Sequence, residues 1–221
     1  HIAATAAAGM VLNIPTVGVI RGEELASKKE LNSTLNYAKS CGMHLEYVSR
    51  SDYKQKNDPA YLKLLLENFK NFYVIPEGGT NGLAIKGCQE ILSQEDLTFD
   101  IICCAVGTGG TIAGLINSSL PTQKIIGFPA LKGGFLNEDI CKFASQSNWE
   151  LWDAYHFGGY AKVDSKLITF MNHFKSTYKI PLDPVYTAKM MYGIFDAIQT
   201  GRIPKNAKVL SIHTGGLQGV E

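Results

Sequence analysis

The sequence predicts an α/β fold with a largely parallel sheet. Apolar runs of strand length alternate with segments of helical periodicity along the 221 residues, as in folds that pack helices on a parallel sheet. The run "FDIICCAV" (99–106) shows no polar alternation, so both faces of that strand are expected to be covered. Clusters of glycine follow three of the expected strands, at the position where α/β folds bind ligands.

The first half of the chain is expected to alternate between strands and helices. Asp58 and Pro59 mark one helix start, because Asp caps helices and Pro is tolerated at the first helical position. The expected order is a helix from His1, a strand at 16–20, a polar-faced helix at 28–41, a strand at 44–49, a helix after Asp58 with Leu62, Leu65 and Phe69 on one face, and a strand at 72–75 that runs into a glycine turn and another helix.

The second half continues this alternation. Apolar positions three or four residues apart mark two helices, and Gly201 is expected to end the second of them. The expected elements are strands at 99–106 and 124–130, a helix with the stripe Leu167, Met171, Phe174 and Tyr178, a helix with the stripe Met190, Met191, Ile194 and Ile198, and a strand at 208–212.

Composition and charge exclude several classes of partner. Apolar residues make up 45% of the chain and charged residues 19%, as in an ordinary soluble globular enzyme. The 21 basic and 20 acidic side chains give a net charge of +1 without a basic face, so we expect no nucleic-acid partner and no membrane partner. The apolar runs are shorter than a membrane span.

Cysteine and histidine usage indicates a reducing compartment and no metal. The five cysteines lack the spacing of zinc sites and redox motifs, and Cys103 and Cys104 are interpreted as small buried hydrophobes in a cytoplasmic protein. The first residues, "HIAATAAAG", lack the basic start of a signal peptide. The five histidines are scattered, so no metal site is expected.

Three glycine clusters, 77–80, 107–111 and 213–216, predict a phosphate-bearing ligand. Glycine lets backbone N–H groups approach an anion, and the dipole of a following helix favours negative charge there; tight turns without a ligand are the structural alternative. A dinucleotide fingerprint would require glycine where Ile112 stands, and no Gly-Lys-Ser/Thr tripeptide of a P-loop follows these glycines. Both nucleotide-binding motifs are therefore disfavoured.

Four motifs, "PEGGTNGLAIKG", "GTGGTIAG", "LDPVYTAKMMYG" and "IHTGG", resemble in their order the D-cysteine desulfhydrase / 1-aminocyclopropane-1-carboxylate deaminase family. This family belongs to the tryptophan-synthase-β-like enzymes that use pyridoxal 5'-phosphate (PLP). The resemblance runs from His1 to Glu221. It implies PLP fold type II, with two three-layer α/β/α domains and mostly parallel sheets: a smaller domain at 1–73, incomplete at its N-terminus, and a larger PLP-binding domain at 74–221.

The resemblance also implies the cofactor contacts and the subclass. Deaminases carry Glu at the position of Thr187 and Leu at that of Thr214, so both threonines are expected beside the PLP ring and on the desulfhydrase side. A neutral hydroxyl makes the ring a weaker electron sink than a carboxylate does, which suits β-elimination better than opening of a cyclopropane. The residues expected to hold the PLP phosphate are Gly107, Thr108, Gly109, Gly110 and Thr111.

Two tyrosines are expected near the substrate and PLP. Tyr186 opens the "YT" pair of the third motif, and Tyr160 ends "YHFGGY", where Tyr155 is an alternative. For any of these tyrosines, a half-buried core ring is the structural alternative.

The family's Schiff-base lysine and its later Ser-Asn pair would lie upstream of His1, and both ends of the chain are interpreted as cuts. Lys86, Lys132 and Lys189 do not stand where the family places its lysine. They are interpreted as solvated or helix-surface lysines.

The expected function is that of a PLP-dependent lyase acting on a small D-amino acid. β-Elimination from D-cysteine to pyruvate, ammonia and sulfide, in a cytoplasmic homodimer, is the leading hypothesis. Two alternatives stay open: a 1-aminocyclopropane-1-carboxylate deaminase, which Thr187 and Thr214 argue against, and a non-catalytic PLP- or phosphate-binding protein.

Overall fold

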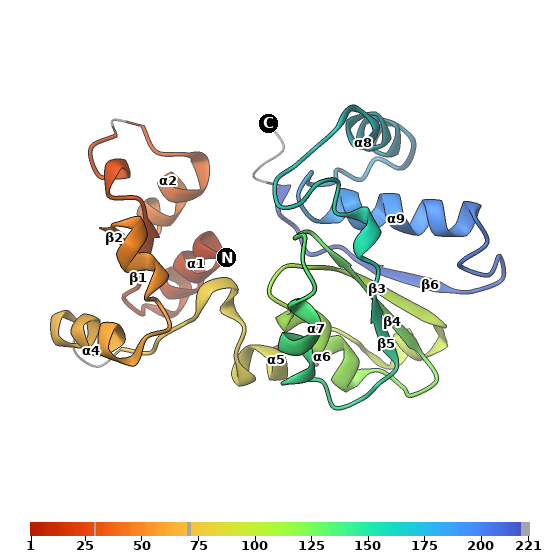
Figure 1. Ribbon diagram of the computed structural model, residues 1–221, viewed down its shortest axis with the longest axis horizontal. Helices are drawn as coiled ribbons and strands as arrows, with labels where there is room; N and C mark the ends of the chain where they lie inside the picture. Colours follow the sequence, from red (N-terminus) through yellow and green to blue (C-terminus); the bar gives the residue numbers. More distant parts are fainter. Residues whose placement is uncertain (29, 70–71, 218–221) are drawn as a thin grey trace. The chain divides into compact units, whose positions relative to one another are not determined.

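The computed structural model describes residues 1–28, 30–69 and 72–217, and its contacts divide the chain into two compact units, His1–Pro76 and Glu77–Glu221. Among the described residues, the first unit has a sheet of two strands and the second a separate sheet of four (Figure 1). The domain ranges expected for the complete protein, 1–73 and 74–221, stay a prediction.

The first unit packs helices on a parallel pair of strands. β1 (Val17–Arg21) pairs with β2 (His44–Val48) in parallel, where strands were expected. α1 (Ile2–Leu12) packs against α2 (Ser33–Ser40). A cluster of buried side chains in this unit contains Ala6, Ala38, Cys41 and Met43.

Two caps determine where helices of the first unit begin. The expected helix over 28–41 is shorter at its start, because the side chain of Asn32 caps α2 and accepts a first-turn N–H group at 2.9 Å. α4 (Pro59–Asn68) begins where it was expected, with the Asp58 carboxylate accepting a first-turn N–H group at 2.7 Å.

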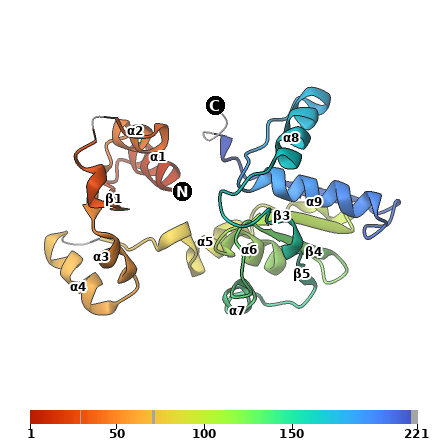
Figure 2. The ribbon, with the colours of Figure 1, turned by 45° about the horizontal axis from the view of Figure 1, so that its top comes forward.

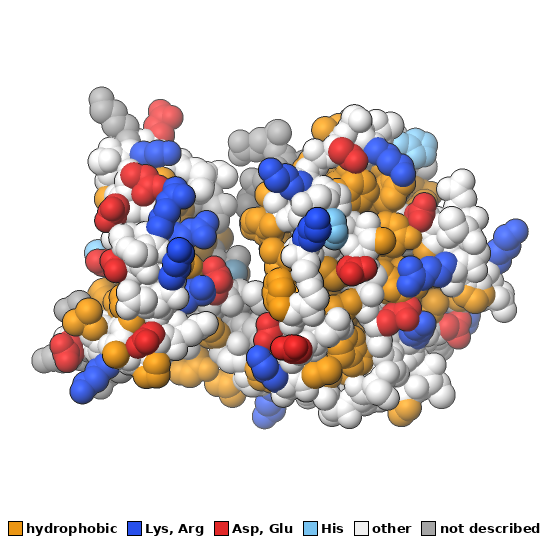
Figure 3. Space-filling view, viewed as in Figure 1, with side chains coloured by type: hydrophobic (Ala, Val, Ile, Leu, Met, Phe, Trp, Pro, Cys, Tyr) orange, Lys and Arg blue, Asp and Glu red, His pale blue; other side chains and the backbone are white. Residues whose placement is uncertain are grey.

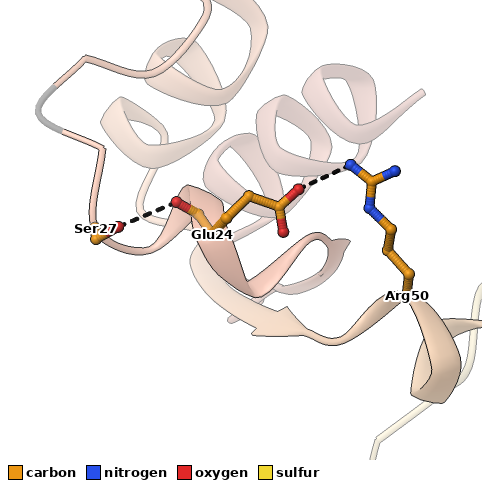
Figure 4. A network of polar contacts seen from close by, with 3 residues as sticks. All are labelled: Glu24, Ser27 and Arg50. Atoms are coloured by element: carbon orange, nitrogen blue, oxygen red, sulfur yellow. Dashed lines mark hydrogen bonds and ion pairs between the residues drawn. The ribbon is translucent and has the colours of Figure 1, made fainter.

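An ion pair joins the short helix α3 (Arg50–Lys54) to the 3-10 turn η1 (Glu23–Leu25). The Arg50 guanidinium donates to the Glu24 carboxylate at 2.9 Å, and the Ser27 hydroxyl donates to the Glu24 backbone carbonyl at 3.2 Å (Figure 4). The hydrogen bond from Arg50 lowers the pKa of Glu24. Both charged side chains are exposed, so the pair orients the loop and adds little stability.

The second unit is built on a parallel sheet with the strand order β5-β4-β3-β6. β3 (Ile101–Val106) lies between β4 (Lys124–Pro129) and β6 (Val209–Ile212), and all six of its residues are buried. This confirms that both faces of β3 are covered. β5 (Trp149–Leu151) adds a short edge strand beside β4, which the sequence did not predict because so short a run has no readable period.

Helices cover both faces of this sheet. Successive side chains of β3 point to opposite faces, so one set packs against α9 (Thr187–Gln199) and the alternate set against α6 (Gly110–Ser118). Figures 1 and 2 show α8 (Ser165–Tyr178) and α9 on one face and α6 and α7 (Leu136–Cys141) on the other. Cys103 belongs to the first set and Cys104 to the second, and both are 0% exposed, which confirms them as small buried hydrophobes.

The two predicted helical stripes correspond to α8 and α9. Leu167 and Phe174 of α8 are buried, and Gly201 follows α9 with a φ of +76°, as expected for a residue that ends a helix. The remaining elements of the unit are η2 (Glu77–Gly79), α5 (Gly82–Cys88), η3 (Gln94–Thr98), α7 (Leu136–Cys141), η4 (Asp153–Tyr155) and α8 (Ser165–Tyr178).

The expected strand at 72–75 is wrong. These residues form an irregular segment, in which Tyr73, Val74 and Ile75 are exposed. A strand needs a neighbour to satisfy its backbone hydrogen bonds, and none of the described strands pairs with this segment. The glycines of 77–80 therefore follow a loop, contrary to the expectation that all three clusters follow strands.

The surface carries both signs of charge. Lys and Arg side chains are interspersed with Asp and Glu on the face of each unit that Figure 3 shows. Within the described ranges, the helices are too short or too polar for a membrane crossing.

Candidate functional site

Two of the glycine clusters leave the same edge of the sheet. β3 and β6 are parallel neighbours, with Cys104 paired to Ile212, so the segments that follow them, 107–111 and 213–216, emerge side by side. Ligands of open α/β sheets bind at the carboxyl ends of the strands. This edge is therefore the candidate site.

The segment 107–111 forms the turn between β3 and α6. Gly109 is the N-terminal cap of α6 with a φ of +90°, a left-handed conformation that glycine adopts without strain. α6 begins at Gly110, and the first backbone N–H groups of a helix have no acceptor within it. These groups and the helix dipole together favour an anion at this turn.

The cluster at 77–80 packs against this turn. The hydroxyl groups of Thr80 and Thr108 share a hydrogen bond of 2.6 Å. A methyl group on Gly110 would lie 2.9 Å from Oγ1 of Thr80, and one on Gly78 would collide with the Thr108 side chain. Only glycine permits these close approaches, so the cluster at 77–80 supports the turn at 107–111.

Two tyrosines lie next to the turn. The Tyr186 ring packs on Gly107, since a methyl group on that glycine would lie 3.4 Å from Cε1 of the tyrosine. The rings of Tyr160 and Tyr186 meet edge to face, with centroids 6.1 Å apart, and Tyr160 is 56% exposed. Burial raises the pKa of Tyr186, and the neighbouring Tyr160 raises it further to a smaller extent. Its phenol is therefore protonated at neutral pH and can donate a hydrogen bond.

Tyr155, the alternative to Tyr160, belongs to the core. Its hydroxyl donates to the Asp196 carboxylate at 2.8 Å, and its ring lies 5.9 Å from that of Phe128. The fold thus brings Tyr160, and not Tyr155, against Tyr186. That Tyr160 and Tyr186 act on a substrate stays a prediction.

Asp183 organises the start of α9, a role that the sequence analysis missed. One carboxylate oxygen accepts the N–H groups of Val185 and Tyr186 at 2.9 and 2.8 Å. The other accepts the N–H group and the hydroxyl of Thr187 at 2.8 and 2.7 Å. An Asp just before a helical stripe is a cap signal, and it could have revealed this residue.

The Thr187 hydroxyl is committed to Asp183. It donates to the Asp183 carboxylate and accepts the Asp183 N–H group at 2.9 Å. Thr187 is 0% exposed and Asp183 is 3% exposed. The expected contact between Thr187 and a cofactor ring stays a prediction, and it has to compete with these two hydrogen bonds.

Thr214 lies exposed in the segment that follows β6. The neighbouring His213 orders this segment: its Nδ1 accepts the Gly215 N–H group at 3.1 Å, and its Nε2 lies 3.0 Å from the Pro181 carbonyl. A methyl group on Gly216 would lie 3.2 Å from Cγ of Asp183. The segment that carries Thr214 therefore rests on the residues that begin α9.

The interpretation of Lys189 as a solvated or helix-surface lysine is wrong. This residue of α9 is 1% exposed, and its ammonium donates to the carbonyls of His156 and Gly159 at 2.9 and 2.8 Å. Burial lowers the pKa of Lys189, and the charge of Asp183 opposes this effect. Lys86 and Lys132 are exposed, as expected.

The turn at 107–111 fits a phosphate group. It combines the start of a nine-residue helix with a left-handed glycine and the side chains of Thr108 and Thr111, the features of an anion site. Binding of PLP by these residues and by Thr187 and Thr214 stays a prediction. The described residues contain no group of three or more His, Cys, Asp or Glu side chains that could hold a metal.

Comparison with known proteins gives one family and a set of relatives. The family described as pyridoxal-phosphate dependent enzyme matches residues 1–215. A mitochondrial bifunctional D-cysteine desulfhydrase/1-aminocyclopropane-1-carboxylate deaminase of Arabidopsis thaliana is 30% identical over 100% of this chain and 62% of its own length. A D-cysteine desulfhydrase of Klebsiella pneumoniae is 30% identical over 65% of this chain and 50% of its own length. The chain thus spans only part of these relatives.

Two solved structures have a fold similar to that of this chain. A homologue of 1-aminocyclopropane-1-carboxylate deaminase matches with a TM-score of 0.81 and 28% identity, over 100% of this chain and 71% of its own. A cystathionine β-synthase of Helicobacter pylori matches with a TM-score of 0.66 at 14% identity, over 95% of this chain and 69% of its own. The second likeness concerns the fold alone.

Proposed function

Because this chain belongs to the family of pyridoxal-phosphate-dependent enzymes and has the α/β fold with parallel sheets of its tryptophan-synthase-β-like members, we propose that it is part of a lyase that releases the β-substituent of a small D-amino acid. D-Cysteine is the proposed substrate, and with water it gives pyruvate, ammonia and hydrogen sulfide. Two relatives at 30% identity whose names include D-cysteine desulfhydrase support this reaction class.

One observation carries the proposal: the glycine turn at 107–111 opens a helix at the carboxyl edge of the sheet, and the Tyr186 ring packs on it. When bound, PLP supplies an electron sink for negative charge on the α-carbon of the substrate. The proposed phosphate ligands are the backbone N–H groups and hydroxyls of Gly107, Thr108, Gly109, Gly110 and Thr111.

Tyr186 and Tyr160 are the proposed substrate-facing residues. The protonated phenol of Tyr186 donates a hydrogen bond to the substrate, and the exposed Tyr160 ring, packed edge-on against it, shields that side from water. Thr187 and Thr214 are the proposed hydroxyls beside the PLP ring, with Thr187 at the position of the deaminase carboxylate. Thr187 also holds Tyr186 in place, since both hydrogen bonds of its hydroxyl go to Asp183, whose carboxylate accepts the Tyr186 N–H group.

Opening of the cyclopropane ring of 1-aminocyclopropane-1-carboxylate is the second candidate function. The double name of the Arabidopsis relative favours it. Thr187 and Thr214 stand against it, because they occupy the positions where the resemblance expects Glu and Leu in deaminases. A hydroxyl stabilises positive charge on a ring nitrogen less than a carboxylate does, so elimination remains the primary proposal.

The test uses the full-length protein loaded with PLP. The ratio kcat/KM is measured for D-cysteine, through hydrogen sulfide and pyruvate, and for the cyclopropane substrate, through ammonia. We expect D-cysteine to be preferred and Tyr186→Phe to lower its kcat/KM by about tenfold or more. Tyr178→Phe, on the exposed end of α8, is the matched control. A preference for the cyclopropane would assign the deaminase function, and no turnover of either would leave non-catalytic binding.

For the complete protein we also propose two three-layer α/β/α domains and a homodimer in the cytoplasm. Light scattering on the purified full-length protein measures its mass, and a monomer would contradict the dimer. A fluorescent fusion reports the compartment.

A further inference from the structure

Lys189 is a buried cation for which the proposed reaction has no use. It is 1% exposed and lies in the first turn of α9, three residues after Tyr186. Its ammonium donates two hydrogen bonds, to the carbonyls of His156 and Gly159 at 2.9 and 2.8 Å. A buried charge lowers stability unless its surroundings compensate it. A methionine of similar length would avoid that cost, so the ammonium is expected to serve a purpose.

The loop that accepts these hydrogen bonds has an unfavourable backbone. Phe157 and Ala161 have φ values of +53° and +55°, and Gly158 and Gly159 between them have +94° and +121°. Residues with a Cβ atom rarely adopt the left-handed region. Backbone of this kind persists only where surrounding contacts determine it, so contacts from outside the loop are expected to hold it.

Lys189 supplies such a contact. Within the loop, the His156 carbonyl accepts the Gly159 N–H group at 3.0 Å, and the Gly159 carbonyl accepts the Lys162 N–H group at 3.1 Å. A carbonyl oxygen can accept two hydrogen bonds. The carbonyls of His156 and Gly159 each accept one backbone N–H group within the loop. The Lys189 ammonium donates the second hydrogen bond to each of them.

The same region of α9 also holds Tyr186. The charge of Asp183 stabilises the Lys189 ammonium, and the Asp183 carboxylate accepts the Tyr186 N–H group at 2.8 Å. Tyr160 follows Gly159 directly, and its ring packs edge-on against Tyr186. Lys189 thus holds the loop that carries Tyr160, and the neighbouring Asp183 holds the segment that carries Tyr186.

We propose that Lys189 is a positioning residue: its ammonium fixes the loop 156–159 on α9 and thereby holds the Tyr160 ring against Tyr186. The final step, from the position of Tyr160 to the handling of substrate, rests on the proposed function. The hold on the loop does not.

Two substitutions in the PLP-loaded full-length protein test this role. Lys189→Met removes the ammonium, and Lys189→Arg keeps a cation that can donate. Met is a good helix former, and both loop carbonyls keep their backbone donors in the Met variant, so the fold is expected to survive. Lys175→Met, which replaces an exposed lysine of α8, is the matched control.

Amide hydrogen exchange over 156–162 measures the hold on the loop. We expect exchange about tenfold faster in Lys189→Met at a melting temperature no lower than that of wild type, and rates close to wild type in Lys189→Arg and Lys175→Met. Equal exchange in Lys189→Met and wild type would overturn the proposal. If Lys189→Met failed to fold, Lys189→Arg would decide: wild-type exchange supports the hold, and fast exchange in a folded protein contradicts it.

Kinetics tests the step to the substrate. A misplaced Tyr160 is expected to lower kcat/KM for D-cysteine by about tenfold to a hundredfold, and Tyr160→Ala combined with Lys189→Met should be no worse than the stronger single change. Additive losses, or a released loop with unchanged kcat/KM, would refute positioning of Tyr160. Failure of the proposed function looks different: wild type would turn over neither substrate, while the exchange result would still decide the hold on the loop.

Discussion

Replacing Thr187 by Val tests whether its hydroxyl is structural. The hydroxyl donates to the Asp183 carboxylate at 2.7 Å and accepts the Asp183 N–H group at 2.9 Å, and both residues are buried. Valine has nearly the same branched shape. The substitution therefore removes two buried hydrogen bonds with little change in packing.

The expected loss follows from those two hydrogen bonds. A hydrogen bond to a charged group contributes about 1.5–3 kcal/mol, and a buried N–H group left without an acceptor costs about 1–3 kcal/mol. Asp183 keeps three backbone donors, from Val185, Tyr186 and Thr187, so values in the lower part of these ranges apply. We expect Thr187→Val to lower the free energy of unfolding by about 3 kcal/mol.

Thr187→Ser is the matched control for this experiment. It keeps the hydroxyl and removes one buried methyl group, which costs about 1 kcal/mol. Urea unfolding of both variants at equal m-values measures the difference, which we expect to be about 2 kcal/mol. If the Val variant were as stable as the Ser variant, the reasoning would be refuted, and the hydroxyl would again be available for a direct contact with the cofactor.

Three further predictions concern the turn, a tyrosine and the cysteines. Gly109→Ala places a side chain on a residue with a φ of +90° and brings its Cβ atom to 2.8 Å from Ile140. Equilibrium dialysis of the full-length protein should therefore show PLP affinity lowered about tenfold or more. The control Gly87→Ala, with open space around the new methyl group, should bind PLP as wild type does. Burial raises the pKa of Tyr186, so above about pH 10 the unfolded chain loses the phenol proton while the folded chain keeps it. The free energy of unfolding of wild type should therefore fall, relative to that of Tyr186→Phe, as the pH rises through about 10. Parallel pH profiles of the two proteins would contradict this. Burial raises the pKa of the Cys103 thiol to about 12, so mass spectrometry after iodoacetamide treatment of the native protein should find Cys141, which is exposed, alkylated and Cys103 intact; early labelling of Cys103 would show that the core opens.

Local sequence patterns, such as helix caps, apolar runs and glycine clusters, correctly predicted several helices, strands and turns. Asp58 before Pro59 predicted the start of α4, because a cap acts on the turn that follows it. The apolar run of β3 predicted a strand covered on both faces. The glycines of 107–111 predicted a turn that opens a helix, since left-handed backbone excludes most other residues.

Features that depend on a distant partner were beyond the sequence. The run 72–75 has the side chains of a strand, yet no described strand pairs with it, and β propensity has no effect without a neighbour. Tyr155 and Tyr160 stand in one short segment, and only packing against α9 separates a core ring from one beside Tyr186.

The sequence by itself determined the fold class and the turn expected to hold a phosphate, because periodicity, caps and glycine torsions are properties of contiguous residues. The family was recognised from the resemblance of four motifs. Tertiary structure alone decided the environment of Lys189, whose carbonyl partners His156 and Gly159 lie on a loop some thirty residues earlier in the chain. Lysine on a helix is ordinarily a surface residue. It becomes a buried donor only where the fold places acceptors and the charge of Asp183 around it, and no local pattern encodes that arrangement.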